Sequence, residues 1–333
     1  MQIKIDKQTY TVQEGETIIE TARRNGIDIP SLCYAKGAKH QASCMVCAVK
    51  NTANGQIIPS CSTRPTEGME LESMSEELKL LRTLSLELLL SDHRADCEAP
   101  CSTVCPVGLD VGRVMELYDN QQHEQARAVI AAAFQLPTIA CDTCEKKPCE
   151  KVCRRGTIDK AVEISQIIHD LVDGNVAPQS ADAYHYDKSR FQSKVGQFTA
   201  DEKARIKLTV DGASRCLHCK CSGQQGCQLR QLATAHGIRR SRYGSSSALP
   251  VLERQHIKGD MWFEPSKCIR CGLCVLNSDN GFTFRDRGFG MQVVIPEENK
   301  NNASVKLAEL CPTGAIYLRG KGKGERGKVK SKT

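Results

Sequence analysis

Nineteen cysteines lie in this chain of 333 residues, and all of them fall into short groups. The groups are Cys33/Cys44/Cys47/Cys61, Cys97/Cys101/Cys105, Cys141/Cys144/Cys149/Cys153, Cys216/Cys219/Cys221/Cys227 and Cys268/Cys271/Cys274/Cys311. His93 is spaced like a further ligand, which brings the count to twenty candidate donors, or five sets of four. Iron–sulfur clusters take four protein ligands each, usually thiolates. The pattern predicts bound clusters, and the odd number of cysteines with C-x2-C spacings disfavours disulfides.

The rest of the composition fits a metal-stabilised protein of the cytoplasm. Seven Phe, seven Tyr and one Trp make a thin aromatic core, so metal binding is expected to contribute to folding. The N-terminal residues MQIKIDKQTYTV alternate polar and apolar types and do not resemble a signal peptide. The longest apolar stretch, residues 84–90, is interrupted by Ser85 and Glu87 and is too short to span a bilayer. Grouped thiols in a reducing cytoplasm bind metal more often than they pair.

The net charge of +7 comes partly from the C-terminal end. Residues 319–333 hold seven Lys or Arg against one Glu, and residues 321–333 are predicted to be a basic disordered tail. Docking of this tail to an acidic partner stays open. Nucleic-acid binding is disfavoured because no aromatic residues are interleaved with the charges.

Residues 1–78 are predicted to form a β-hairpin, Ile3–Ile5 with Thr9–Val12, followed by a helix from about Thr17 to Asn25. The spacing Cys33-x10-Cys44-x2-Cys47-x13-Cys61 suits a [2Fe–2S] cluster, and the small residues Ala42 and Ser43 allow backbone N–H groups to reach the sulfurs. Zinc is disfavoured by the ten-residue gap. The segment resembles the N-terminal β-grasp ferredoxin domain of the large iron–sulfur subunit of NADH dehydrogenase and of iron-only hydrogenases.

A helical apolar pattern over Glu76–Leu90 leads into the next predicted domain, residues 79–175. The following stretch, LELLLSDHRADC, resembles the segment before the His/Cys-ligated cluster of the same two families, in which the motif begins His-x3-Cys. That resemblance implies that His93 binds iron together with Cys97. The alternative is an ordinary surface histidine after a helix.

Two further cysteine runs, Cys97-x3-Cys101-x3-Cys105-Pro106 and Cys141-x2-Cys144-x4-Cys149-x3-Cys153, follow. They resemble the helical domain that precedes the flavin domain of glutamate synthase small subunits and of dihydropyrimidine dehydrogenase. The resemblance implies an α-helical domain with two [4Fe–4S] clusters. One would be held by His93, Cys97, Cys101 and Cys153, and the other by Cys105, Cys141, Cys144 and Cys149.

In that family a flavin domain comes next, but residues 176–205 are polar and contain no Gly-rich strand–turn–helix, so they are predicted to be a linker in its place. Residues 206–250 then carry Cys216-x2-Cys219-x-Cys221-x5-Cys227, compact enough for one centre, and a short helix over Gln228–His236. Four thiolates suit either a [4Fe–4S] cluster or a structural zinc ion, and both stay open.

Residues 251–320 carry Cys268-x2-Cys271-x2-Cys274 and Cys311-Pro312, a signature that resembles bacterial ferredoxins and predicts one [4Fe–4S] cluster. The positions expected to ligate a second cluster hold other residues: Ser278, Asn301, Ser304 and Leu307. One cluster is therefore retained and its neighbour lost.

Together these segments predict an α+β multidomain protein: a β-grasp [2Fe–2S] domain, an α-helical dicluster domain and a small ferredoxin-like domain. One [2Fe–2S] and four [4Fe–4S] clusters amount to about 18 iron atoms. The resemblances imply an electron-transfer subunit in a hetero-oligomer, between an NADH-dehydrogenase-type flavin subunit and a redox catalytic subunit. No flavin, NAD or catalytic motif is evident. The alternatives are a self-contained flavin-dependent oxidoreductase and a zinc-binding structural adaptor.

Overall fold

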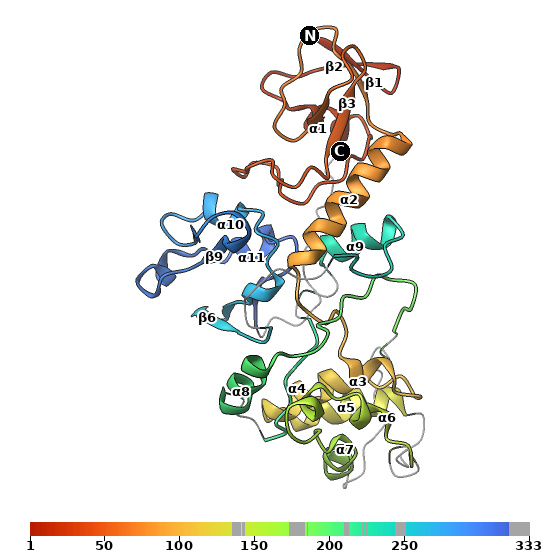
Figure 1. The fold of residues 1–333 in the computed structure, drawn as a ribbon, viewed down its shortest axis with the longest axis vertical. Coiled ribbons are helices and arrows are strands. Elements are labelled where there is room, and N and C mark those ends of the chain that lie inside the picture. The colour runs from red at the N-terminus through yellow and green to blue at the C-terminus, as the bar shows by residue number, and fades with distance from the viewer. Residues whose placement is uncertain are drawn as a thin grey trace. The chain divides into compact units, whose positions relative to one another are not determined.

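The computed structural model describes residues 1–134, 141, 144–172, 184, 186–209, 213–221, 223, 226–243 and 251–319. The chain divides into two compact units. The first unit contains Met1–Arg94, Gln225–Leu249 and Glu253–Thr333, and the second contains Ala95–Gln224 with Pro250–Leu252. In sequence, the second unit is therefore inserted into the first (Figure 1).

The first unit begins with a five-stranded sheet. In spatial order its strands are β2 (Gln8–Thr11), β1 (Gln2–Ile5), β5 (Glu70–Glu72), β3 (Ala48–Asn51) and β4 (Ile57–Pro59). β1 pairs parallel with β5, and the other pairs are antiparallel. Ile3 and Ile5 alternate inward from β1 and pack on Ile18 and Ile19 of helix α1 (Ile18–Arg24). The predicted hairpin and helix are both confirmed.

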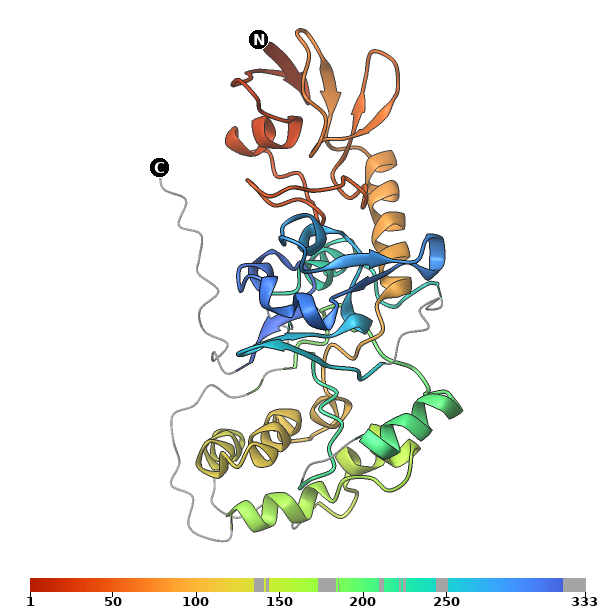
Figure 2. The ribbon, with the colours of Figure 1, turned by 90° about the vertical axis from the view of Figure 1, so that its left-hand side faces the viewer.

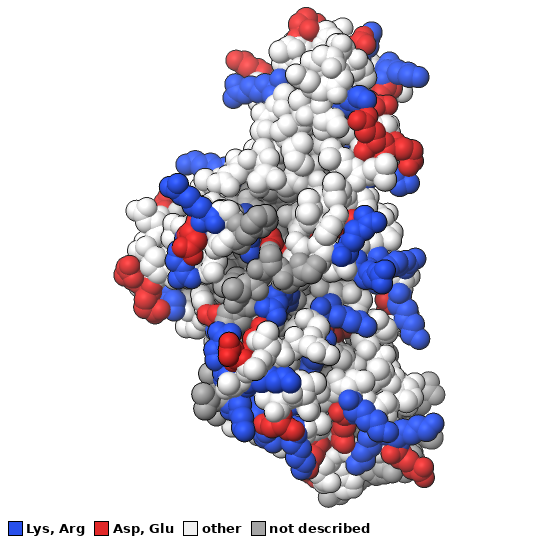
Figure 3. Space-filling view, in the orientation of Figure 1, with Lys and Arg blue, Asp and Glu red and all other residues white. Residues whose placement is uncertain are grey.

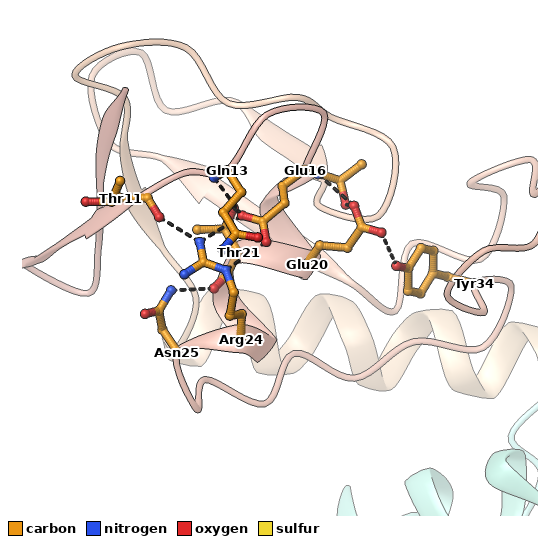
Figure 4. A network of polar contacts seen from close by, with 9 residues as sticks. Thr11, Gln13, Glu16, Glu20, Thr21, Arg24, Asn25 and Tyr34 are labelled. Atoms are coloured by element: carbon orange, nitrogen blue, oxygen red, sulfur yellow. Dashed lines mark hydrogen bonds and ion pairs between the residues drawn. The ribbon is translucent and has the colours of Figure 1, made fainter. Parts of the chain in front are cut away.

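A polar network fixes both ends of α1 (Figure 4). At the N-terminus, Glu20 accepts hydrogen bonds from the Thr17 backbone and hydroxyl, each at 2.9 Å, in a capping box. The Tyr34 hydroxyl donates to the same carboxylate at 2.9 Å. Because Tyr34 follows Cys33 directly, the helix cap also anchors the start of the first cysteine loop.

Glu16 gives the first unit an acid-sensitive contact. Arg24 donates two hydrogen bonds of 2.8 Å to its carboxylate, and these lower its pKa from 4.5 to about 2, against the opposing effect of burial. The carboxylate thus stabilises the fold above pH 4.5, and this contribution is lost as the pH falls toward 2. After allowance for solvent screening, Glu16→Gln is expected to cost about 1–2 kcal/mol at pH 7 and much less at pH 2.5, measured by urea unfolding. Glu14→Gln, at an exposed neighbour, is the control; an equal loss at both pH values would contradict the prediction.

Helix α2 (Glu76–Asp92) forms where the leucine pattern predicts it, and it buries Leu78, Leu86 and Leu90 on one face while Leu80, Leu84 and Leu88 are exposed. Ser75 caps its first turn by accepting a hydrogen bond from the Leu78 backbone N–H. Its buried face packs on β3 and on α9 (Gln228–Ala235), where the Thr83 hydroxyl and the His236 ring lie 3.1 Å apart. The predicted helices over Glu76–Leu90 and Gln228–His236 are therefore confirmed to within two residues.

The C-terminal part of the first unit is small and built on two sheets (Figure 2). One sheet has the order β10 (Ile316–Leu318), β7 (Met261–Phe263), β6 (Gln255–Lys258), and the other pairs β8 (Thr283–Arg285) with β9 (Gln292–Val294). Short helices α10 (Leu273–Leu276) and α11 (Leu307–Leu310) complete it, with 3-10 turns η2 (Pro265–Lys267), η3 (Gly288–Gly290) and η4 (Glu297–Asn302). Its core centres on Phe263 and Phe282, whose rings meet edge to face at 5.3 Å.

The second unit is helical where it is described (Figure 1). Its elements are α3 (Pro100–Thr103), α4 (Val111–Asp119), α5 (His123–Ala133), α6 (Pro148–Lys151), the 3-10 turn η1 (Arg154–Thr157), α7 (Ile164–Val172) and α8 (Ala200–Thr209). Buried Met115 of α4, Ile130 of α5 and Ile168 of α7 form its apolar centre. The mixed α and β character that the sequence predicts is thereby confirmed.

Some predictions fall on residues that the structure does not describe. They are the first part of the 176–205 linker and the 321–333 tail. None of the described helices is both long and apolar enough to cross a bilayer. On the face drawn in Figure 3, basic and acidic side chains are interspersed.

Candidate iron–sulfur cluster sites

The first four cysteines converge in the first unit. Cys33 follows α1, Cys44 and Cys47 precede β3, Cys61 follows β4, and all four are at most 6% exposed. The Cys33 thiol is in hydrogen-bonding contact with Cys44 and Cys61, and Cys61 also contacts Cys47. These contacts lower the pKa of Cys33 and Cys47 and raise that of Cys44 and Cys61, because the thiols share hydrogen bonds and cannot all ionise together. The predicted [2Fe–2S] ligand set is brought together, and ligation itself stays a prediction.

Backbone groups support this set. The N–H groups of Ser43 and Cys44 donate to the Cys33 sulfur, as expected for a loop of small residues. Ala42 and Met45 have positive φ angles of 51° and 53°, which turn the loop around the thiols. N–H bonds to sulfur are a main determinant of cluster potential.

The C-terminal set also converges. Cys268, Cys271, Cys274 and Cys311 line one cavity, walled by apolar residues that include Phe263, Val293 and Ile316. The Arg270 N–H donates to Cys268 Sγ at 3.3 Å, and the Ile316 N–H donates to Cys311 Sγ at 3.4 Å. Burial first, and then the neighbouring thiols, raise the pKa of Cys274 well above its usual value. Such thiols become thiolates only when a cation compensates their charge, which suits a cluster site.

A second cavity with four thiols lies within the second unit. Its cysteines come from three separate segments: Cys101 in α3, Cys153 before η1, and Cys216 with Cys219 in the loop after α8. The first two and the last two belong to different clusters in the prediction from cysteine spacing and family resemblance. The cavity therefore joins half of one predicted set with half of another.

The other cysteines of the second unit are distributed around its helical core. Cys105, Cys141 and Cys149 pack against this core, and burial, followed by the charges of Glu150 and Cys105, raises the pKa of Cys149 to about 11. Cys144 is half-buried, and its N–H donates to the Cys141 carbonyl at 3.2 Å. Their predicted ligation of one cluster stays a prediction.

Four candidate donors lie near two of the points at which the chain passes from one unit to the other: His93, Cys97, Cys221 and Cys227. His93, at the end of α2 in the first unit, is 6% exposed, and burial lowers its pKa to about 4 with a further effect of Lys267. Its Nδ1 is buried and has no hydrogen-bond partner among the described residues. A neutral, buried imidazole is the form that ligates metals, so this geometry favours a ligand over a surface histidine.

Cys97, Cys221 and Cys227 are buried as well. Cys97 Sγ accepts a hydrogen bond from the Ser193 N–H at 3.3 Å within the second unit. Cys227 is the N-cap of α9 in the first unit, and its sulfur accepts a hydrogen bond from the Arg230 N–H at 3.5 Å. Cys221 and Cys227 form one predicted set with Cys216 and Cys219, and of these four only Cys216 and Cys219 line the second-unit cavity.

Comparison with known proteins identifies two domains in the chain. A family described as a 2Fe-2S iron-sulfur cluster binding domain matches residues 1–76, and one described as dihydropyrimidine dehydrogenase domain II, 4Fe-4S cluster, matches residues 91–178. The chain therefore carries a 2Fe–2S domain and a 4Fe–4S domain, as its cysteine spacing predicts.

Several curated proteins are similar over part of this chain. The NAD-reducing hydrogenase HoxS subunit gamma of Cupriavidus necator is 36% identical over 97 residues, which cover 29% of this chain and 41% of that protein. The NADP-reducing hydrogenase subunit HndD of Solidesulfovibrio fructosivorans is 34% identical over 161 residues, covering 45% and 27%. The NADPH-Fe(3+) oxidoreductase subunit alpha of Geobacter sulfurreducens is 28% identical over 186 residues, covering 52% and 21%. The chain thus spans 21–41% of the length of these relatives.

Among solved structures, the crystal structure of an NAD+-reducing [NiFe]-hydrogenase in the H2-reduced state is similar in fold. The match has a TM-score of 0.51 at 16% identity, and it covers 97% of this chain and 89% of that chain. At this identity the likeness concerns the fold alone.

Proposed function

We propose that this chain is an electron-transfer subunit of an NAD(P)H-linked oxidoreductase complex. In this role it connects a flavin subunit that oxidises NAD(P)H with a catalytic redox subunit, of the kind found in hydrogenase, formate dehydrogenase or transhydrogenase complexes. The printed names of its relatives, which include NAD- and NADP-reducing hydrogenase subunits, support this proposal. Iron–sulfur clusters, when bound, supply one-electron transfer.

The observation that carries the proposal is the contact between two cysteine loops of the first unit. Asn277 Oδ1 accepts a hydrogen bond of 3.0 Å from the Lys39 N–H, and Asn277 Nδ2 donates one of 2.8 Å to the Lys39 carbonyl. Lys39 lies in the loop between Cys33 and Cys44, and Asn277 ends helix α10, which carries Cys274. The reciprocal bonds therefore hold the predicted [2Fe–2S] loop against the predicted ferredoxin-type loop.

A glycine makes the contact closer still. A Cβ atom on Gly272 would lie 3.0 Å from the Gln41 side-chain oxygen, and Gly272 has a φ of +78°, so glycine suits this position on both counts. Burial, and then the thiols of Cys311 and Cys268, raise the pKa of Cys271, and Cys33 of the other loop adds a smaller effect in the same direction. Two redox centres held by these loops would be neighbours, which supports a role in passing electrons.

The proposal includes one [2Fe–2S] and four [4Fe–4S] clusters, a hetero-oligomeric assembly and a reducing, cytoplasmic compartment. It is tested on protein purified anaerobically, by iron and sulfide analysis with EPR. About 18 iron atoms per chain, no flavin and no NADH oxidation by the chain alone are expected. Stoichiometric flavin with NADH oxidation, or a colourless zinc-loaded protein, would contradict the proposal.

Loosening the loop contact should slow electron exchange without removing iron. In Asn277→Ala the bonds to Lys39 are lost, together with a 2.8 Å bond to the Leu273 carbonyl that closes α10. We expect electrons to equilibrate between the two centres at least roughly threefold more slowly, which corresponds to about 0.7 kcal/mol in the barrier. The measurement is rapid freezing after sub-stoichiometric reduction, with the [2Fe–2S] and ferredoxin-type EPR signals as the readout. Asn54→Ala, in an exposed turn, is the control. Equal rates in both variants would remove the support that this contact gives.

A further inference from the structure

We propose that one [4Fe–4S] cluster is held by four cysteines that no matched domain contains as a set: Cys101, Cys153, Cys216 and Cys219. The last two lie in residues 213–221, here called the ligand arm, which is outside the matched residues 91–178. The inference rests on the proposed presence of clusters, and it is independent of where the electrons go. The ligand arm would thus supply two of the four ligands of a site whose other two ligands come from the helical domain.

The cavity is the first observation. The four thiols line it together with apolar side chains that include Met115, Val162 and Ile164. Cys101, Cys153 and Cys216 also pack against the apolar core of the second unit.

The arm also has the local geometry of a cluster-binding loop. In the ferredoxin-type loop, Arg270 has a φ of +56° and its N–H donates to Cys268 Sγ at 3.3 Å. In the arm, His218 has a φ of +48° and its N–H donates to Cys216 Sγ at 3.3 Å. Both segments are C-x2-C sequences with a left-handed residue before the second cysteine. The chain therefore builds the same sulfur-binding turn twice.

Helix α4 holds the arm from both ends. Asp119, its last residue, accepts hydrogen bonds from the Ser214 N–H at 2.8 Å and the Ser214 hydroxyl at 2.6 Å, and lies 3.0 Å from His218 Nε2. Asp110, its N-cap, is paired with Lys220. Between them, a Cβ on Gly112 would lie 2.8 Å from Ala99 Cβ and 3.6 Å from Lys220 Cβ, so a larger residue would have to displace α3. These contacts fix Cys216 and Cys219 without using either sulfur.

A buried cation completes the site. Arg155 is 3% exposed, lines the cavity and pairs with Asp159 through two bonds of 2.7 Å. Its Nη1 is buried with no hydrogen-bond partner in the part of the chain that the structure describes. A cluster with four thiolates carries net negative charge, and a buried guanidinium N–H beside it would be satisfied by sulfur. Asp159 also pairs with Arg215 of the arm at 2.5 Å, so the cation and the arm share one partner.

The test uses iron counts in the full chain purified anaerobically. Cys101→Ala and Cys216→Ala are each expected to lose about four iron atoms, and the double variant should lose no more than either single one. The double variant Cys216→Ala/Cys271→Ala, with changes in two different proposed sites, should lose about eight. A loss of about eight from Cys101→Ala/Cys216→Ala would overturn the proposal, and so would stoichiometric zinc with an unchanged iron count. The [2Fe–2S] EPR signal in each variant reports whether the first unit is intact.

A second variant keeps every thiol, so it tests the proposal even if the cysteine variants fail to fold. Arg155→Met is expected to lower the reduction potential of the EPR signal that Cys216→Ala abolishes, because a positive charge beside that centre is lost, and to leave the other signals in place. Arg113→Met, on the outer side of α4 with 40% exposure, is the matched control. If the reduction potential of a different EPR signal shifts instead, or if no potential shifts, the assignment is overturned. Failure of electron transfer with these iron results intact would instead count against the proposed function alone.

Discussion

Replacing Cys311 with alanine is expected to remove one cluster, about four iron atoms per chain, and to destabilise the C-terminal part of the first unit. The core there is small, and Cys268, Cys274 and Cys311 are themselves packed against it. Where ligands form part of a small core, the free energy of metal binding contributes to the free energy of folding. Iron analysis and hydrogen exchange of residues 255–318 are the measurements.

Ser304→Ala is the matched control, because Ser304 stands where a second cluster of a two-cluster ferredoxin would have a ligand. It is exposed, and its hydroxyl accepts only a 3.3 Å bond from the Lys306 N–H among the contacts described. Iron content and exchange rates should be unchanged. Equal iron losses from both variants, or full iron retention in Cys311→Ala, would refute the assignment of this site.

Arg82→Met is expected to destabilise the first unit by about 2–4 kcal/mol, the largest effect predicted for a residue that ligates nothing. Arg82 is 4% exposed, and its Nη2 donates to the Ala48 carbonyl at 2.7 Å and the Ser73 carbonyl at 2.9 Å. Burial lowers its pKa, yet the guanidinium stays charged because no arginine deprotonates in this range. Methionine keeps most of the stem volume but leaves two buried carbonyls without a donor.

The midpoint of urea unfolding, followed by circular dichroism, measures this loss. Lys79→Met, on the exposed face of the same helix, should change stability by less than about 0.5 kcal/mol. Because Ala48 follows Cys47, the variant should also broaden the [2Fe–2S] EPR signal. A stability equal to that of the Lys79 control would show that the two carbonyls are satisfied in another way.

Local patterns were enough to predict several elements of this fold. The β1–β2 hairpin follows from polar–apolar alternation and α2 from a leucine period, both of which act over a few residues, and α1 and α9 were likewise predicted within single segments. The spacing of Cys33, Cys44, Cys47 and Cys61 likewise predicted a set that the structure brings together. In each case the residues that decide the outcome lie in one segment.

Contacts between distant segments could not be predicted in this way. Asn277 meets Lys39 across 238 positions, and neither residue belongs to a motif. Cys216 and Cys219 were grouped with Cys221 and Cys227 because these four are adjacent in sequence. Asp110 and Asp119 instead hold the arm along α4, where it meets Cys101 and Cys153. Sequence proximity groups thiols by spacing, whereas tertiary packing decides which of them share a cavity.

The insertion of the second unit into the first has a consequence for synthesis on the ribosome. Chains emerge from the N-terminus, so Ala95–Gln224 are complete before any residue that closes the first unit leaves the exit tunnel. Helix α2 cannot pack on α9 until residues 228–235 have emerged, and Arg94 finds its acceptor, the Ser266 carbonyl, later still. A nascent chain that stalls before Gln228 would therefore hold the helices of the second unit while the part of α2 that packs on α9 is still uncovered, a species that chaperones would be expected to bind.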